Sequence, residues 1–278
     1  MLSYRHAFHA GNYADVLKHI VLVEILAYLC SKAKPFDYID THAGAGIYRL
    51  NSQQAQKNRE YENGIGRLKP DDWPELNTYF DIIAGFNPDR SLKNYPGSPK
   101  IAEALLRSRD RAWLYEMHPG DYESLLKAFA KQPKVNIAPS DGFAGLISLL
   151  PPKSKRALIL IDPSYEIKQD YAHVVEVLRK AHRRFATGIY AIWYPVVERR
   201  RINAMESALV NSGIRRIQLF ELGQQGLSQT SRMHAAGMIV VNPPWPLFAK
   251  MQTLLPKLAE ALAIVGKPHY RCEVLVEE

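Results

Sequence analysis

An apolar run at residues 157–161 ends abruptly in a carboxylate, and this feature constrains the fold most strongly. Short runs rich in Leu and Ile are typical of strands that helices cover on both faces of a parallel sheet. The next four residues, 162–165, read Asp-Pro-Ser-Tyr. Ligands of open α/β sheets bind just beyond the carboxyl ends of the strands. The sequence therefore predicts a doubly wound α/β fold with a reacting group at this strand end.

The side chains after this strand suit methylation of an exocyclic amine on a planar base. Such an amine is a poor nucleophile because the ring shares its lone pair. The Asp162 carboxylate and the Pro163 carbonyl can accept its two N–H bonds and so direct the lone pair. Tyr165 can stack on the base. An ordinary Asp-Pro turn at a strand end is the structural alternative.

A second strand end, within residues 36–46, precedes a glycine-rich turn. Asp40 ends the strand, and Gly44 and Gly46 let a ligand approach the backbone closely. The turn lacks the third glycine of a dinucleotide fingerprint and the Gly-Lys-Ser/Thr of a P-loop. We therefore expect S-adenosylmethionine as the cofactor.

Two further strand ends carry acids in the order that a doubly wound sheet supplies them. Residues 112–116 end in Glu116, which suits ribose hydroxyls, and residues 135–142 end in Asp141, which suits an adenine amino group. Gly142 permits close contact there. Each acid alone could cap a helix or sit in a turn. Because four successive strand ends carry an acid, we expect a shared site.

Several longer strings reinforce this interpretation. They lie at residues 4–12, 15–19, 40–46, 95–99, 162–165 and 193–195. In these strings the sequence resembles the RlmJ family, and the resemblance spans nearly the whole chain. Members of this family are bacterial enzymes that methylate N6 of one adenine in 23S ribosomal RNA with S-adenosylmethionine. The resemblance implies that Asp162 acts at the target amine and that Tyr4 meets the RNA. It also implies cofactor contacts from His19, His42, Ser98, Glu116, Asp141 and Gly142.

One position departs from the family's Asp-Pro-Pro-Tyr pattern, because Ser164 stands at the third place. Serine restores a backbone N–H and loosens φ. The Asp162 carboxylate, the Pro163 carbonyl and Tyr165 remain, so we expect activity to survive with some loss of rigidity. An inactive or retuned paralogue is the alternative.

A second match to the amino-methyltransferase pattern, Asn-Pro-Pro-Trp at residues 242–245, follows another apolar run. Residues 157–161 form the fourth strand counted from the glycine turn, next to the first in a doubly wound sheet, whereas Asn242 comes near the end of the chain. We therefore interpret residues 242–245 as a structural turn. A contact to RNA through Trp245 is the less favoured interpretation.

The amino terminus gathers His6, His9 and His19 around an expected amphipathic helix, residues 14–29. The spacing matches no specific zinc motif, so we expect no metal. An arm formed by Tyr4, Arg5 and Phe8 could stack on an extruded base and contact phosphate. The alternative is a tail packed on the core.

The remaining segments complete one methyltransferase domain over residues 1–278. Residues 51–94 are polar with helical stretches, and predict a small helical insertion subdomain. Three later strands, at 188–194, 215–222 and 237–241, alternate with helices at 171–184 and 197–212. Together they predict a seven-stranded, mainly parallel Rossmann-like S-adenosylmethionine-dependent methyltransferase fold.

Charge and composition agree with an RNA partner. The formal net charge is +8 with a pI near 9.3, which favours an anionic partner. Cys30 and Cys272 make no metal or redox spacing. No signal pattern appears, and the apolar run at residues 20–29 is too short to span a bilayer. We expect a cytoplasmic monomer with 23S rRNA as partner and neither membrane nor metal.

The function expected from the sequence is methylation of N6 of a specific adenine in free or partly assembled 23S rRNA. An N6-adenine DNA methyltransferase is the rival enzyme, because the same chemistry serves both nucleic acids. A nucleic-acid-binding protein without catalysis, linked to the use of external DNA, is a third interpretation. Ser164 is its only support in the sequence.

Overall fold

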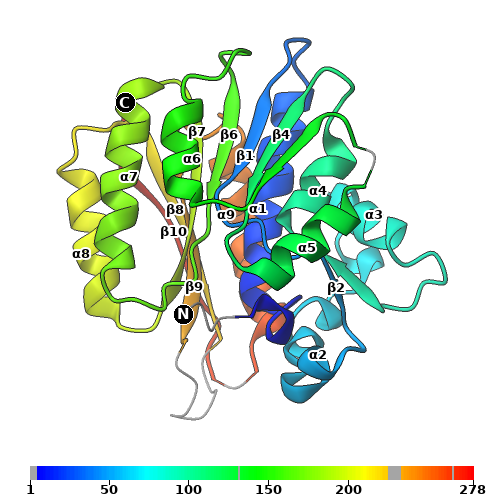
Figure 1. Ribbon diagram of the computed structural model, residues 1–278. Helices are drawn as coiled ribbons and strands as arrows, with labels where there is room; N and C mark the ends of the chain where they lie inside the picture. Colours follow the sequence, from blue (N-terminus) through cyan, green and yellow to red (C-terminus); the bar gives the residue numbers. More distant parts are fainter. Residues whose placement is uncertain (1–4, 131, 225–232, 265) are drawn as a thin grey trace.

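The computed structural model describes residues 5–130, 132–224, 233–264 and 266–278. Helices flank an eight-stranded central sheet (Figure 1). Its strand order is β10-β8-β9-β7-β6-β1-β4-β5. The bounds are β1 Asp37–Asp40, β4 Arg111–Tyr115, β5 Val135–Ala138, β6 Ala157–Ile161, β7 Ile189–Val196, β8 Ile217–Gly223, β9 Ala235–Val241 and β10 His269–Val276. A separate pair consists of β2 Ile47–Arg49 and β3 Asn94–Pro96, which run antiparallel.

Strands β5, β4, β1, β6 and β7 pair in parallel, whereas β9 runs antiparallel between β7 and β8. The predicted α/β class and the three later strands are confirmed as β7, β8 and β9. An eighth strand, β10, pairs antiparallel with β8 and was not predicted. Its side chains are half-buried or exposed and mix charged with apolar residues. An edge strand of this kind lacks the continuous apolar run that identifies a buried one.

Two apolar cores cover the two faces of the sheet. Along β6, Leu158 and Leu160 belong to one core, and Ile159 and Ile161 belong to the other. This alternation follows from the two-residue period of a strand. Both faces of β6 therefore pack against apolar side chains, and the strand is buried along its whole length, as the sequence predicted.

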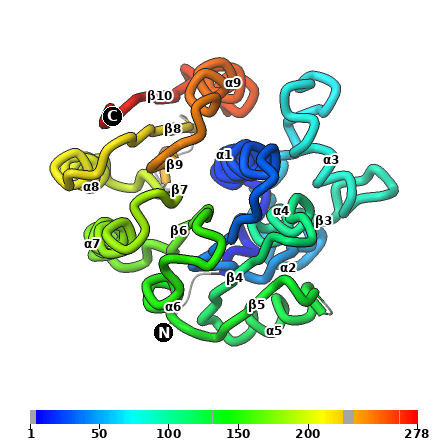
Figure 2. The backbone as a smooth tube through the Cα atoms, turned by 90° about the horizontal axis from the view of Figure 1, so that it is seen from above, coloured from blue at the N-terminus to red at the C-terminus, as the bar shows by residue number. Residues whose placement is uncertain are grey.

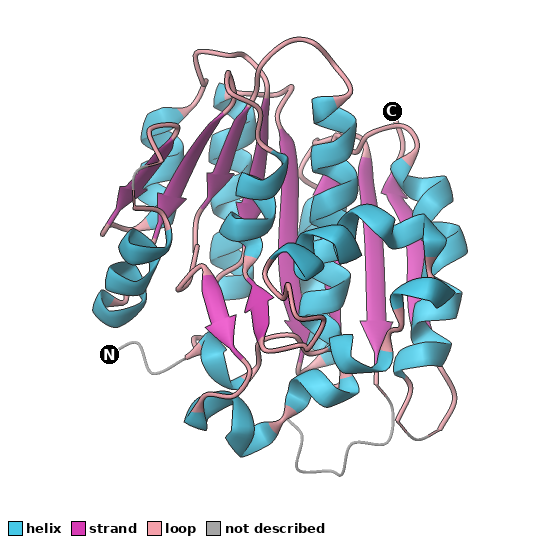
Figure 3. Cartoon of the chain, turned by 90° about the vertical axis from the view of Figure 1, so that its right-hand side faces the viewer, coloured by secondary structure: helices cyan, strands magenta, loops and turns pink. Residues whose placement is uncertain are grey.

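The helices divide between these faces. Seen from above, α6 Gly142–Leu149, α7 Asp170–Arg184 and α8 Arg199–Val210 lie on one side of the strands (Figure 2). On the other side lie α1 Tyr13–Cys30, α4 Ser98–Leu105 and α9 Leu247–Leu262, and Figure 3 shows helices in front of and behind the sheet. Helix α5 Pro119–Ala128 contributes Leu125 to the same core as α1.

Helix α1 is buried on nearly every face, so the amphipathic interpretation of residues 14–29 is wrong. The helix contacts α4, α9, β8 and β9. Asn12 caps its start by accepting a hydrogen bond from the Asp15 backbone N–H. Asp15, Lys18 and His19 are buried along with the apolar residues. Polar residues that resemble a solvent-facing stripe in the sequence therefore lie inside the protein.

Residues 51–94 contain short helices that pack against α1. They include α2 Gln53–Asn58, α3 Asn77–Gly85 and the 3₁₀ helices Glu60–Asn63, Ile65–Arg67, Pro70–Asp72 and Pro74–Leu76. Another 3₁₀ turn, His6–Phe8, precedes α1. Trp73, Leu76 and Tyr79 join the core that contains α1. The division of the chain into one domain with a subdomain at 51–94 stays a prediction. Among the described residues, no helix is both long and apolar enough to cross a bilayer.

Candidate active site

Four acids that follow parallel strands meet at the carboxyl edge of the sheet. Asp40 ends β1, where it pairs in register with Leu114 of β4 and Leu160 of β6. Glu116 follows β4 directly and Asp162 follows β6 directly. Asp141 comes shortly after β5 and caps α6. Because parallel strands end at the same edge of the sheet, these acids lie at one edge although they are far apart in the sequence.

Asp162 is paired with a buried lysine from α1. The Lys18 Nζ lies 2.7 Å from Asp162 Oδ2 and 2.9 Å from Asp15 Oδ1. Burial raises the pKa of the Asp162 carboxyl to about 6, against the lowering effect of the Lys18 ammonium. Burial alone would lower the pKa of Lys18, but Asp15 and Asp162 raise it well above its usual range. The lysine therefore stays charged beside a carboxylate that titrates near neutrality.

Asp15 connects this pair to the amino-terminal segment. Its Oδ2 accepts hydrogen bonds from the Gly11 backbone N–H at 2.9 Å and contacts His6 Nε2 at 2.8 Å. Burial would raise the pKa of Asp15, but His6 and Lys18 hold it well below its usual range. The polar chain His6, Asp15, Lys18, Asp162 thus links the start of the described chain to the end of β6.

Tyr165 lies beside Asp162 in a strained backbone conformation. Its φ is 51°, a left-handed value that costs a residue with a Cβ about 1 kcal/mol. Its hydroxyl donates to the Trp193 carbonyl at 2.7 Å, and its ring centroid lies 6.0 Å from that of Trp193. The Lys18 Nζ lies 5.8 Å from the Trp193 ring centroid. Stacking of Tyr165 on a base stays a prediction, but its ring is anchored just beyond the carboxyl end of β6.

Asp40 organises the glycine turn from inside. Its carboxylate accepts hydrogen bonds from Tyr38 and Ser98 hydroxyls, each at 2.7 Å, and from the His42 backbone N–H at 3.2 Å. Burial raises the pKa of Asp40, and these bonds oppose that shift. Ser98 is 6% exposed, so it supports the turn through Asp40. A direct contact of Ser98 with the cofactor stays a prediction.

Glu116 holds the same turn from the next strand. One carboxylate oxygen accepts the Gly44 N–H at 2.8 Å and the other accepts the His118 N–H at 2.7 Å. Burial raises the pKa of Glu116 against these two bonds. Gly44 and Gly46 adopt φ values of 63° and 82°, which favour glycine. The turn therefore has the backbone freedom that the sequence predicted.

Gly142 allows two segments to meet. A Cβ at this position would lie 1.9 Å from the Thr41 carbonyl oxygen. The residue is therefore required for contact between the start of α6 and the turn after β1, and a close approach to the cofactor is a separate prediction. The Asp141 Oδ1 accepts the Phe143 N–H at 2.9 Å, and this exposed side chain faces solvent at the helix start.

Two histidines predicted as cofactor contacts, the buried His19 and the half-buried His42, are neutral at pH 7. Burial lowers the pKa of His42 to about 4 and that of His19 to about 3. The His42 ring stands edge-on to Phe143 at 5.0 Å. The His19 Nδ1 contacts the Tyr95 hydroxyl at 2.8 Å, while its Nε2 is buried without a partner in the structure. An orphaned buried nitrogen of this kind is a polar atom that a bound ligand can satisfy.

Comparisons with known proteins identify the family. A family model described as "Ribosomal RNA large subunit methyltransferase D, RlmJ" matches residues 33–276. The chain belongs to this family. It is 49% identical to ribosomal RNA large subunit methyltransferase J of Escherichia coli K12 and 47% identical to the protein of that name from Haemophilus influenzae, with full coverage of all three chains. A crystal structure of protein LPL1258 from Legionella pneumophila is 36% identical, with a TM-score of 0.87 over 96% of this chain and 98% of that chain.

The RlmJ fold places the Asn242 motif away from the cluster of acids. Strand β9 runs antiparallel to β7, with Tyr190 opposite Val241, so Asn242 lies at the edge where β7 begins. The Asn242 side chain donates to the carbonyls of Ala186 at 2.7 Å and Gly188 at 2.8 Å. These bonds support the interpretation of residues 242–245 as a structural turn. The antiparallel direction of β9, in addition to the position of the motif in the chain, separates residues 242–245 from the cluster of acids.

Two residues at the site, Lys18 and Trp193, were not predicted individually from the sequence. Lys18 was noted only within the string 15–19, and Trp193 only within 193–195. A signal for Lys18 exists in the sequence, because Asp15 and Lys18 are spaced three apart in a helix that is otherwise largely apolar. Its partner Asp162 lies 144 positions away, and only the fold brings the two together. Tyr4 lies outside the described residues. Within the described chain, no three His, Cys, Asp or Glu side chains form a group that could hold a metal.

Gly142→Ala tests the close packing of α6 against the turn after β1. The new Cβ must displace the Thr41 backbone, and such overpacking costs about 1–3 kcal/mol of unfolding free energy. Urea unfolding measures the loss. Gly85→Ala is the matched control, because a Cβ at Gly85 meets nothing within 4 Å and should leave stability unchanged or raise it by up to about 1 kcal/mol. Equal stability of both variants would contradict the close contact.

Proposed function

We propose that this protein transfers a methyl group from S-adenosylmethionine to N6 of an adenine in 23S ribosomal RNA. The observation that carries the proposal is Asp162, a half-buried carboxylate paired with the buried Lys18 at the end of a central parallel strand. Two whole-length relatives, both named ribosomal RNA large subunit methyltransferase J, support the reaction class and the RNA. Those names do not support the DNA methyltransferase or the non-catalytic interpretation.

The residues at the carboxyl edge fit this cofactor. S-adenosylmethionine, when bound, supplies an electrophilic methyl group and carries a positive charge. Asp40, Glu116 and Asp141 make the edge acidic, which suits a cation and disfavours a cofactor with phosphates. The unpartnered Nε2 of His19 and the neutral ring of His42 add a polar atom and a flat surface. These five side chains, with the turn at Gly44 and Gly46, would hold the cofactor.

The mechanism assigns direction and proton removal to the residues after β6. An adenine turned out of its stack would present N6 to the Asp162 carboxylate and the Pro163 carbonyl, which accept its two N–H bonds. Tyr165 and Trp193 form the aromatic surface next to that position. As N6 gains a carbon it must lose a proton, and Asp162 takes the proton directly or through water. A pKa of about 6 suits this exchange at neutral pH.

Ser164 does not disturb this arrangement. The residue is half-buried, and the neighbouring carboxylate keeps its 2.7 Å contact with Lys18. The extra backbone N–H is the only new polar group on the main chain. The geometry at Asp162 therefore supports an active enzyme rather than a protein that has lost catalysis.

The amino-terminal segment contacts the same site through His6, and we propose that it also contacts the RNA substrate. Arg5 pairs with Asp121 at 3.3 Å, and His9 contacts Glu60 at 2.8 Å. Both contacts fix the segment next to His6, which belongs to the polar chain to Asp162. Tyr4 would extend from this segment to the RNA. A protein of this size needs an accessible adenine, so free or partly assembled RNA is the proposed substrate.

The test is methyl transfer from labelled S-adenosylmethionine to three nucleic acids. Protein-free 23S rRNA, assembled large subunits and duplex DNA are incubated in parallel, and the modified base is identified after digestion. We expect N6-methyladenine in free 23S rRNA, with far less label in the assembled subunits and none in DNA. Label in DNA would support the rival enzyme. Retained cofactor binding without transfer to any of the three would support the non-catalytic interpretation.

A further inference from the structure

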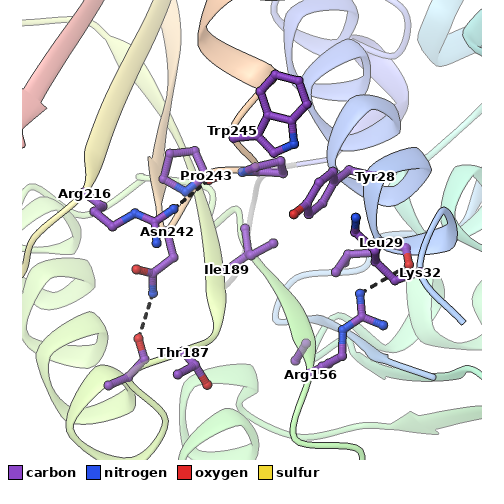
Figure 4. A pocket seen from close by; sticks show the side chains of 13 residues that line it. Tyr28, Leu29, Lys32, Arg156, Thr187, Ile189, Arg216, Asn242, Pro243 and Trp245 are labelled. Atoms are coloured by element: carbon purple, nitrogen blue, oxygen red, sulfur yellow. Dashed lines mark hydrogen bonds between the residues drawn. The ribbon is translucent and has the colours of Figure 1, made fainter. Parts of the chain in front are cut away.

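A polar cavity lies at the opposite edge of the sheet from Asp162. It has a volume of about 400 Å³, within the range of sites for small organic ligands. Its walls come from the end of α1, the start of β6, the start of β7 and the turn after β9 (Figure 4). From Arg156 to Asp162 the chain makes six extended steps of about 3.3 Å, so roughly 20 Å of sheet separates the two edges. The cavity is therefore distinct from the proposed active site.

The lining of this cavity is positively charged. Lys32, Arg156 and Arg216 contribute to it, and none of the lining residues is an acid. The Lys32 ammonium makes no ion pair within the described chain and lies 5.3 Å from the Tyr28 ring centroid. Arg216 meets Glu278 at 3.5 Å, but that glutamate side chain is 85% exposed and the pair is weak. An anion is the ligand that such a lining favours.

An exposed aromatic ring stands at the mouth of the cavity. Trp245 is 80% exposed, and no other aromatic ring in the described structure stacks on it. Trp side chains are highly buried on average, and one that is exposed offers the face of its ring to a ligand. Tyr28 adds a second ring on the facing wall (Figure 4). The combination of cations and rings is typical of surfaces that bind single-stranded nucleic acid.

The turn that carries Trp245 is held by hydrogen bonds and by two prolines. Asn242 has a left-handed φ of 51° and holds the carbonyls of Ala186 and Gly188 through its side chain. Pro243 and Pro244 then fix the backbone up to the tryptophan. The Arg216 guanidinium donates to the Pro243 carbonyl at 3.4 Å. A preformed platform binds with less loss of conformational entropy than a mobile side chain does.

We propose that this cavity binds one nucleotide of an unpaired RNA segment, with its base on Trp245 and its phosphate among Lys32, Arg156 and Arg216. The site rests on the proposed function only in that the RNA is the methylation substrate. It gives the protein a second binding site for that RNA, at the edge of the sheet opposite the reacting adenine. An acidic peptide would use the cations but would leave Trp245 without a role.

Three variants and one control test the site. Trp245→Ala removes the ring, while Lys32→Gln and Arg216→Gln each remove one charge. Arg156 is left in place because its guanidinium donates to backbone carbonyls at Leu29 and Lys34 and so supports the fold. Arg109→Gln is the control, since the side chain of this exposed arginine before β4 makes no hydrogen bond or ion pair in the described structure. Affinity for a labelled fragment of 23S rRNA is measured by fluorescence anisotropy at several salt concentrations, together with kcat and KM for methyl transfer.

The three variants should weaken RNA binding in different ways. Loss of stacking in Trp245→Ala should raise Kd and KM by about five- to a hundredfold and leave the salt dependence unchanged. Loss of a phosphate contact in Lys32→Gln or Arg216→Gln should lower the slope of log K against log salt by about 0.7 to 0.9. The value of kcat at saturating RNA should stay at the wild-type level, because the cavity does not touch the reacting amine. Arg109→Gln should match the wild type in all four quantities.

Several results would overturn the assignment. Wild-type affinity and salt slope in all three variants would show that RNA does not use this cavity. Weaker binding in the two charge variants with normal binding in Trp245→Ala would indicate an anion site without a stacked base. In both cases a wild-type protein that methylates RNA leaves the proposed function standing. A wild-type protein that neither binds nor methylates the RNA would remove both proposals.

Discussion

Asp162→Ala should lower kcat for RNA methylation by about 10²–10⁴-fold, the usual contribution of a positioned acid or base. The alanine removes the oxygen that directs N6 and the group that receives its proton. It leaves the glycine turn untouched, because Asp40 and Glu116 hold that turn through separate hydrogen bonds. Binding of S-adenosylmethionine should therefore stay within a few-fold of wild type by calorimetry. Single-turnover methylation of 23S rRNA measures the loss of rate.

The controls for this experiment separate chemistry from folding. Asp81→Ala removes an exposed carboxylate on α3 that makes no hydrogen bond or ion pair in the described chain, and it should leave kcat unchanged. Asp162→Asn keeps a hydrogen-bond acceptor but cannot take a proton at neutral pH. A rate close to wild type in Asp162→Asn would limit the role of Asp162 to orientation. A rate close to wild type in Asp162→Ala would contradict the assignment of the site.

The strand ends could be predicted because their signals are local. A buried parallel strand reads as an unbroken apolar run, and the residue that follows it lies at the ligand-binding edge by construction. Residues 157–161 therefore predicted both β6 and the position of Asp162. The family strings extended this from one strand end to most of the chain, and the match over residues 33–276 confirms the family.

The partner of Asp162 could not be predicted in the same way. Whether a charged residue in a helix faces water or a carboxylate depends on what covers the helix, and α1 is covered by α4, α9, β8 and β9. Lys18 and Asp15 consequently resembled the polar stripe of an amphipathic helix. The same limit applies to residues 242–245. Their Asn-Pro-Pro-Trp pattern alone fits a reacting site, but β9 is antiparallel to β7, so the pattern lies at the other edge of the sheet.

Lys18→Met should shift the pH dependence of catalysis. The wild-type rate should fall tenfold per pH unit below about 6, because Asp162 must be ionised to accept a proton, and should be level above about 7. The Lys18 ammonium lowers the pKa of Asp162 against the effect of burial. Its removal should raise that pKa by about one to three units, the usual effect of an adjacent cation, so the inflection moves to higher pH and the rate at pH 7 falls by about two- to a hundredfold. Raising the pH should restore part of the lost rate.

Two companion variants decide whether the charge of Lys18 is responsible. Lys18→Arg keeps a cation beside Asp162 and should keep the inflection near pH 6. Lys250→Met breaks the ion pair with Glu24, which measures 2.7 Å and lies outside the site, so its profile should match the wild type. Removal of one partner from a buried pair also destabilises a protein by about 3–5 kcal/mol, so all rates are measured well below the melting temperature of Lys18→Met. A lower rate in Lys18→Met with an unmoved inflection would show that the lysine supports the fold without setting the ionisation of Asp162.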